Sequence, residues 1–296
     1  MKNRATFAII RSTALEILSE PLTLLVLLTA LALTILAPVF HYHQFGEPTR
    51  MARDAGLSAL FTCGGALAVF TTIRAFRREI ESGTLEMALA HPVSRGGFFL
   101  SKIAGAFLAL LVTSGIIFGT TVTIVNGAAV GGRIADETGQ LATVWGPCVA
   151  AGVATMVAPL ALGAVLNRFG RFRFVLTALV TALALALGAM VFFCCREGFG
   201  LLSHLAPVAV LLVILATVFL SAAGAFAVRF AANAAASLTG LVLAAMMPFV
   251  GNYYLADALS KGGRVPWSYV GGAALASLPA IAAFLALGVF LSRGRD

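Results

Sequence analysis

Long runs without a single Asp, Glu, Lys or Arg alternate with short charged stretches along the chain. Eight runs reach or nearly reach the length needed to cross a hydrocarbon core of about 30 Å, which takes about 20 apolar residues as a helix. Backbone polar groups cannot be left unpaired in lipid, so these runs predict helices. The runs cover residues 21–46, 55–73, 103–132, 138–167, 174–195, 198–228, 230–256 and 265–292.

Adjusting the ends of these runs gives the expected helices. They are predicted at residues 22–40, 56–76, 99–127, 144–166, 173–194, 206–228, 233–250 and 269–291. The fold class is therefore all-α, a polytopic transmembrane bundle of about eight spans. Pro248 cuts the seventh helix short, so six or seven spans plus a re-entrant segment stand as the alternative. No Pro-, Gly- or Ser-rich linker divides the chain, and we expect one transmembrane domain over residues 21–292.

The first twenty residues carry a different pattern. Apolar residues recur there at helical spacing, while the charged residues lie off that stripe. The stripe consists of Phe7, Ile10, Ala14, Ile17 and Leu18. The pattern predicts an amphipathic helix over residues 1–20 lying in the membrane interface, broken by Pro21 where the chain enters the membrane. The apolar core starts too far from the N-terminus for a cleaved signal peptide.

Composition strengthens the membrane interpretation. Of the 296 residues 60% are hydrophobic and only 11% are charged, against about 25% charged in soluble domains. Soluble enzymes, nucleic-acid-binding domains and disulfide-rich secreted modules are thereby excluded. The net charge of +8 is assigned to loops that follow the positive-inside rule. With eight spans and the N-terminus inside, 14 of the 20 Lys and Arg residues fall on the cytoplasmic side, so both termini, including the tail 293–296, are expected there.

One charged stretch is longer than the others and lies between the second and third helices. Residues 77–102 read RREIESGTLEMALAHPVSRGGFFLSK. Its carboxylates lie on the side where the chain otherwise displays cations. A short helix over residues 77–90 is expected on the membrane surface, interrupted by Gly83 and ended before Pro92. The plainer alternative is a connecting loop whose charges keep it in water.

This stretch resembles the signature of ABC type-2 exporter membrane subunits. The resemblance rests on EIESGTLE at 79–86, HPVSR at 91–95 and FFLSK at 98–102. The Phe45-Gly46-Glu47 loop and PFVGNYYLADAL at 248–259 are similar to members of that family too. The common core of the family has six helices, whereas eight are predicted here.

The resemblance implies a permease that pairs with a second copy or a paralogue in a bacterial inner membrane and docks onto a dimer of cytoplasmic ATP-binding-cassette ATPases. The segment 77–98 would be its coupling loop, which transmits ATPase closure. The contact residues implied by position are Glu79, Glu81, Ser82, Gly83, Thr84, Leu85 and Glu86. ATP would be bound by the partner, because this chain has no G-x-x-x-x-G-K-[ST] loop.

Other chemistry is weakly supported. No H-E-x-x-H or G-x-S-x-G motif is present, so no catalytic, cofactor or metal residues are assigned. His41 and His43 could form a metal site but are better explained as interfacial histidines. The four cysteines have no zinc or redox spacing and are expected to be inert. Gly115 and Gly119 form a G-x-x-x-G pair that would allow close helix packing, or its spacing is accidental in a Gly-rich chain.

Three rival functions stay open beside the ATPase-driven permease. A mechanical transducer would pass ATPase motion to an extracytoplasmic partner without carrying cargo. An ion-coupled secondary transporter would need buried ionisable relays, and all eight runs lack Asp, Glu, Lys and Arg. An intramembrane enzyme would need a catalytic constellation, which the sequence does not show.

Overall fold

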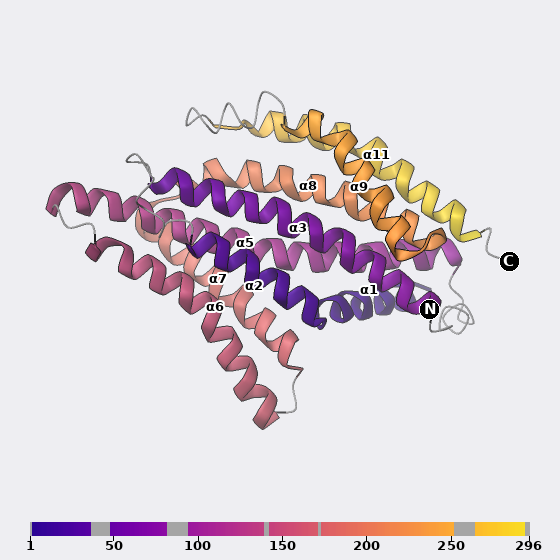
Figure 1. Ribbon diagram of the computed structural model, residues 1–296, viewed down its shortest axis with the longest axis horizontal. Coiled ribbons are helices and arrows are strands. Elements are labelled where there is room, and N and C mark those ends of the chain that lie inside the picture. Colours follow the sequence, from indigo (N-terminus) through magenta and orange to yellow (C-terminus); the bar gives the residue numbers. More distant parts are fainter. Residues whose placement is uncertain are drawn as a thin grey trace. The chain divides into compact units, whose positions relative to one another are not determined.

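The described part of each predicted apolar run is mainly helical in the computed structural model, which describes residues 2–36, 48–81, 94–138, 142–170, 173–251 and 264–293. Within those ranges the regular structure is all helix, which confirms the all-α fold class. Figure 1 shows the helices. They are α1 (Lys2–Leu18), α2 (Pro21–Leu36), α3 (Pro48–Glu81), α5 (Arg95–Thr138), α6 (Ala142–Gly170), α7 (Phe174–Glu197), α8 (Gly200–Arg229), α9 (Ala232–Gly251) and α11 (Trp267–Arg293).

The number of candidate membrane spans is lower than the number of apolar helices. In the described part of the chain six helices are long and apolar enough to cross a membrane: α3, α5, α6, α7, α8 and α11. A seventh is obtained if α1 and α2, which meet at a bend of 59°, count as one broken span. The described apolar part of α9, Ala232–Ala245, is shorter than a span. The structure therefore agrees with the six-or-seven alternative, and the expected polytopic bundle is confirmed.

Two helices extend well beyond the predicted limits. The helix α3 has 34 residues and α5 has 44, because a helix does not have to end where its sequence becomes charged. Arg77–Glu81 is consequently the last part of α3. The expected separate helix over residues 77–90 does not begin at Arg77, and its part after Glu81 lies outside the described residues.

The chain forms two compact units, and α3, α5 and α8 each contribute one part to both. The first unit contains Met1–Ile17, Gly65–Leu111 and Val210–Asp296. Here α8 packs closely on its neighbours, because a Cβ at Gly224 would overlap Ile103 of α5. The helix α11 lies against α8 through Phe226 and Phe284, whose ring centroids are 6.1 Å apart.

The N-terminal helix α1 also belongs to the first unit and confirms the predicted helix. Its buried face includes Ala14 and Ile17. Phe7 was expected on the same stripe, but its side chain is 68% exposed. The helix packs through its second half, so its first turns leave Phe7 and Arg4 on the outer surface.

The second unit contains Leu18–Gly64 and Val112–Ala209. In it α6 and α7 form a hairpin that also contacts α2. A Cβ at Gly119 would lie 3.0 Å from the carbonyl oxygen of Ala186, and one at Gly115 would lie 3.4 Å from Leu183. The G-x-x-x-G pair of α5 thus lies against α7, as close packing of membrane helices requires.

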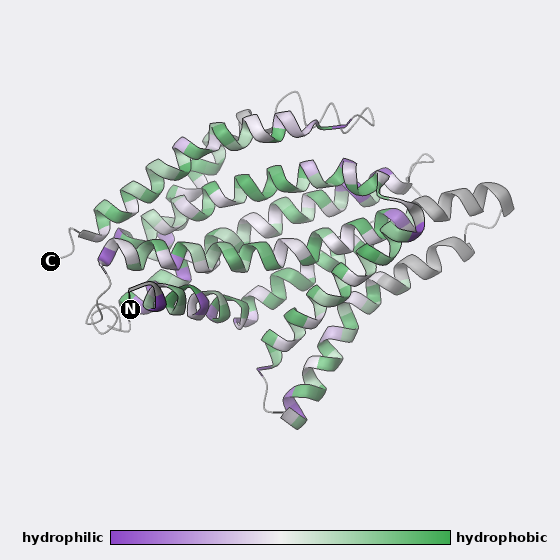
Figure 2. Ribbon diagram, turned by 180° about the vertical axis from the view of Figure 1, so that it is seen from behind, coloured by the Kyte–Doolittle hydropathy of each residue, from purple (hydrophilic) through white to green (hydrophobic). Residues whose placement is uncertain are grey.

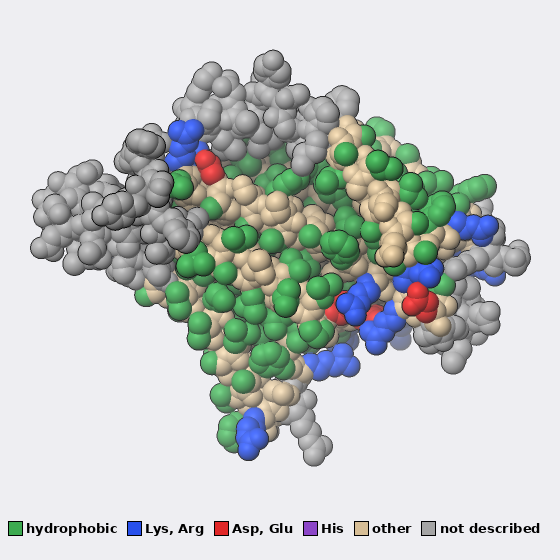
Figure 3. All heavy atoms as spheres, viewed as in Figure 1, with side chains coloured by type: hydrophobic (Ala, Val, Ile, Leu, Met, Phe, Trp, Pro, Cys, Tyr) green, Lys and Arg blue, Asp and Glu red, His purple; other side chains and the backbone are tan. Residues whose placement is uncertain are grey.

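Polar and apolar residues separate along the helices. Figure 2 shows hydrophobic residues through the middle of the long helices and hydrophilic residues mainly near helix ends. On the face drawn in Figure 3, Lys, Arg, Asp and Glu side chains gather near the region where α1 and the end of α3 lie in Figure 1. Both α1 up to Ile17 and the end of α3 belong to the first unit.

Candidate functional site

The predicted coupling residues lie at and beyond the end of α3. Glu79 and Glu81 are within the last three residues of that helix, and the chain is described again from Ser94, just before α5 begins at Arg95. The other predicted contact residues, Ser82, Gly83, Thr84, Leu85 and Glu86, lie outside the described residues. We call Ala75–Glu81 and Arg95–Lys102 the two stems of the segment 82–93.

Ser94 starts the second stem. Its hydroxyl oxygen accepts a hydrogen bond from the Gly97 N–H at 3.2 Å, and its carbonyl oxygen accepts one from the Phe98 N–H at 2.9 Å. This is the arrangement of an N-cap serine, whose side chain satisfies one of the free N–H groups of the first helical turn. The start of α5 is therefore fixed by local sequence, directly after the Pro92-containing segment.

Lys102 is the buried centre of the site. Its side chain is only 1% exposed, although it carries a charge inside a candidate membrane span. The ammonium Nζ lies 2.8 Å from Oε1 of Glu79 and donates a hydrogen bond to the carbonyl oxygen of Ala75 at 2.6 Å. Ala75 and Glu79 are four residues apart and so share one face of α3. One ammonium thus bridges two successive turns of the facing helix.

Aromatic rings surround the charge. Nζ of Lys102 lies 5.4 Å from the ring centroid of Phe76 and 5.7 Å from that of Phe98. These distances are within the range of cation–π attraction. Phe76 in turn packs against Phe99 at 5.4 Å between centroids. The rings keep water from most of the ion pair and leave Glu79 as its less buried partner, 25% exposed.

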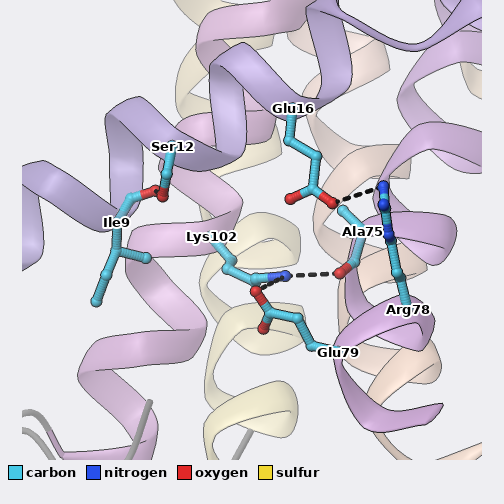
Figure 4. A network of polar contacts seen from close by, with 7 residues as sticks. All are labelled: Ile9, Ser12, Glu16, Ala75, Arg78, Glu79 and Lys102. Carbon is cyan, nitrogen blue, oxygen red and sulfur yellow. Dashed lines mark hydrogen bonds and ion pairs between the residues drawn. The ribbon is translucent and has the colours of Figure 1, made fainter. Parts of the chain in front are cut away.

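A second ion pair connects this stem to the N-terminal helix. Nη1 of Arg78 donates a hydrogen bond to Oε1 of Glu16 at 3.2 Å. Since Arg78 directly precedes Glu79 in the chain, the Lys102–Glu79 and Arg78–Glu16 pairs lie next to each other (Figure 4). The helix α1 also comes very close to α5. A Cβ at Gly105 would lie 2.7 Å from the carbonyl oxygen of Ile10. The end of α3, the start of α5 and α1 are therefore joined at one place.

Glu81 has a different environment. Its carboxylate pairs with Arg77 at 3.0 Å, one helical turn back, and its side chain is 64% exposed. Exposed pairs of this kind contribute little to stability. Of the two predicted contact residues that the structure describes, Glu79 is thus held by Lys102 within the chain, whereas Glu81 is on the surface.

Sequence reasoning missed the role of Lys102, which it placed among the charges at the entrance to the third helix. The available signal was a single lysine separated only by Ser101 from three apolar residues, Phe98–Leu100, and followed by a long apolar run. An ionisable residue inside a span calls for a partner. That the partner is Glu79, 23 positions earlier, requires the structure.

The contacts of the described residues suit this site to holding the two stems in a fixed relation. Among the described residues no group of three or more His, Cys, Asp or Glu side chains could hold a metal ion. His41, His43 and His91 lie outside them. Cys63 and Cys194 are buried free thiols and Cys195 is an exposed one.

Comparison with known proteins gives one match. The model of a family described as ABC-2 family transporter protein matches residues 25–196, which is more than half of the chain and includes the end of α3, the segment 82–93 and α5. No curated protein and no solved structure matches the chain.

Proposed function

The chain belongs to the ABC-2 transporter family, and on that premise we propose that it is the permease subunit of an exporter energised by a separate cytoplasmic ATP-binding subunit. Family membership and the six or seven candidate spans make it a multi-pass membrane transport subunit. The energising partner, a dimer of ATP-binding-cassette ATPases, is part of the proposal. So are pairing with a second copy or paralogue, an inner-membrane location, cytoplasmic termini, and an interfacial position for α1.

The coupling contact is proposed to lie in the acidic segment 79–86, which begins in the last turn of α3, with Glu81 and the residues after it facing the ATPase. The observation that carries this is the acidic segment inside the matched region, with Glu81 exposed at the last residue of α3. Its carboxylates offer charge to a cationic groove, and its apolar residues offer anchors. Because Glu79 is held by Lys102, the outward contacts come from Glu81 and the residues after it.

The test is purification of the tagged full chain from its own membranes together with an ATP-binding-cassette subunit, followed by ATPase assays. Glu79 is left unchanged, because its loss would strand the buried charge of Lys102. Two variants address the contact: Glu81→Gln with Glu86→Gln, and Gly83→Val, which adds bulk where a close backbone approach is proposed. Asp54→Asn, in an exposed pair with Arg50 at 3.9 Å, is the matched control.

Loss of two rim carboxylates should weaken the complex roughly two- to thirtyfold. Gly83→Val should leave all charges in place and still lower ATPase stimulation. Wild-type recovery of complex and stimulation in both variants would refute the contact. Failure of the wild-type chain to bring down any ATP-binding-cassette subunit would refute the proposed function itself.

A further inference from the structure

Lys102 is more deeply buried than any other charged side chain that the structure describes, and its position is unusual for a lysine. It lies in the seventh position after Arg95, on the stem that follows the segment 82–93, and it binds the stem that precedes that segment. The two stems are joined covalently only through that segment. Lys102 therefore connects the two stems directly, by a contact outside the segment 82–93.

The connection is directional, unlike an apolar contact. Nζ donates to the Ala75 carbonyl and pairs with Glu79, which are atoms on successive turns of α3. A slide or rotation of α5 against α3 would break at least one of these contacts. Leaving either charge buried and uncompensated would disfavour the separated state by about a hundredfold or more. The two stems should consequently move as one body.

The same body includes α1. Gly105, three residues beyond Lys102, lets α1 touch α5, and Arg78, adjacent to Glu79, adds a more exposed pair with Glu16. A displacement applied at the segment 82–93 therefore reaches three helices at one junction. Without Lys102 the stems could separate, and the displacement would be absorbed locally.

We propose that Lys102 is a positioning residue of the coupling apparatus: bound to Glu79, it joins the two stems so that movement of the segment 82–93 is passed to α1 and α5 together. This inference rests on the proposed function, since it requires an ATPase that moves that segment. It assigns to Lys102 no contact with the ATPase or with cargo.

The experiment uses the full chain in complex with its ATP-binding-cassette subunit, reconstituted in lipid nanodiscs. Hydrogen–deuterium exchange is measured over residues 4–18 and 95–110 with and without ATP and vanadate. Lys102→Met removes the charge and takes from Glu79 its lysine partner. The double variant Lys102→Met with Glu79→Leu replaces the pair by apolar side chains and is expected to fold, because such replacements are often neutral for stability. Asp54→Asn, which removes an exposed carboxylate of the same helix, is the control.

In the wild type and in Asp54→Asn, ATP should change exchange in both regions. The apolar double variant should bind the ATPase and hydrolyse ATP, while its ATP-dependent change in α1 falls by about fivefold or more. A merely structural role would not move this readout in a variant that folds and binds. Lys102→Met, if it folds, should behave in the same way.

An apolar double variant whose α1 responds to ATP as strongly as the wild type would overturn the inference and leave the proposed function intact. A wild-type complex that hydrolyses ATP with no change in α1 would overturn it as well. A wild-type chain that binds no ATP-binding-cassette subunit would overturn both.

Discussion

A single added methyl group at Gly105 should dislodge the N-terminal helix. The Cβ of Gly105→Ala would lie 2.7 Å from the Ile10 carbonyl oxygen and 2.7 Å from Cβ of Thr13. The first of these is a backbone atom, which cannot move aside unless α1 moves. Overpacking of this kind typically costs about 1–3 kcal/mol, whereas the exchange of Gly for Ala inside a helix gains about 1 kcal/mol.

The control Gly188→Ala separates these two effects. Nothing lies within 4 Å of the Cβ position at Gly188, in the middle of α7, so this variant should show only the gain. The free energy of unfolding of Gly105→Ala should therefore lie about 1–3 kcal/mol below that of Gly188→Ala. Unfolding can be followed by the reaction of a thiol-specific dye with Cys63 and Cys194, which are buried and free in the folded chain.

Hydrogen exchange gives the local readout. Backbone amides of residues 4–18 should exchange faster in Gly105→Ala, because α1 is displaced from its packing position on α5 and the geometry of the Glu16–Arg78 pair is lost. Exchange in α7 should be unchanged. If Gly105→Ala proved as stable as Gly188→Ala, with α1 equally protected, the close approach of α1 to α5 would be refuted.

Lys102→Met should lower the free energy of unfolding by about 3–5 kcal/mol, and adding Glu79→Leu should restore most of that loss. Denaturant unfolding of the purified chain measures both variants, and a double variant less stable than Lys102→Met alone would contradict this prediction. A reporter fused at Asp296 should give a cytoplasmic signal, since the Lys and Arg distribution favours a cytoplasmic N-terminus and an even number of spans returns the chain to the same side; an external signal would contradict the proposed orientation and indicate an odd number of spans. The chain purified without a partner should hydrolyse no ATP, because it has no phosphate-binding loop; turnover sensitive to a substitution in this chain would contradict that expectation.

The helices could be predicted from the sequence because charge-free runs are a strong signal in a membrane chain. The limits of α3 and α5 could not, because a helix continues through charged residues once its buried partners supply compensation. Arg77 and Glu79 were expected in a separate short helix over residues 77–90, yet both belong to α3. The charge-free run over residues 103–132 belongs to a helix that begins earlier, at Arg95.

The position of the candidate site along the chain could be predicted from the sequence, but the contacts between its side chains could not. The acidic segment and its proximity to the second and third helices follow from the order of residues. The pairing of Glu79 with Lys102 depends on the rotation of two helices about their axes, which hydropathy does not specify. The same is true of Phe7, whose spacing fits the apolar stripe although its side chain is 68% exposed.

The contrast between the two glutamates of α3 has a consequence for ionic strength. Salt screens exposed charges separated by more than a Debye length of about 8–10 Å at physiological concentrations, and it screens buried pairs much less. Glu81 is 64% exposed, whereas the partner of Glu79 is 1% exposed. A high-salt wash of membranes should therefore strip a partner held by Glu81 and its neighbours while the Lys102–Glu79 pair keeps α3 and α5 together. Returning to low salt should then restore the complex without refolding, so that a different ATPase preparation can be bound to the same permease.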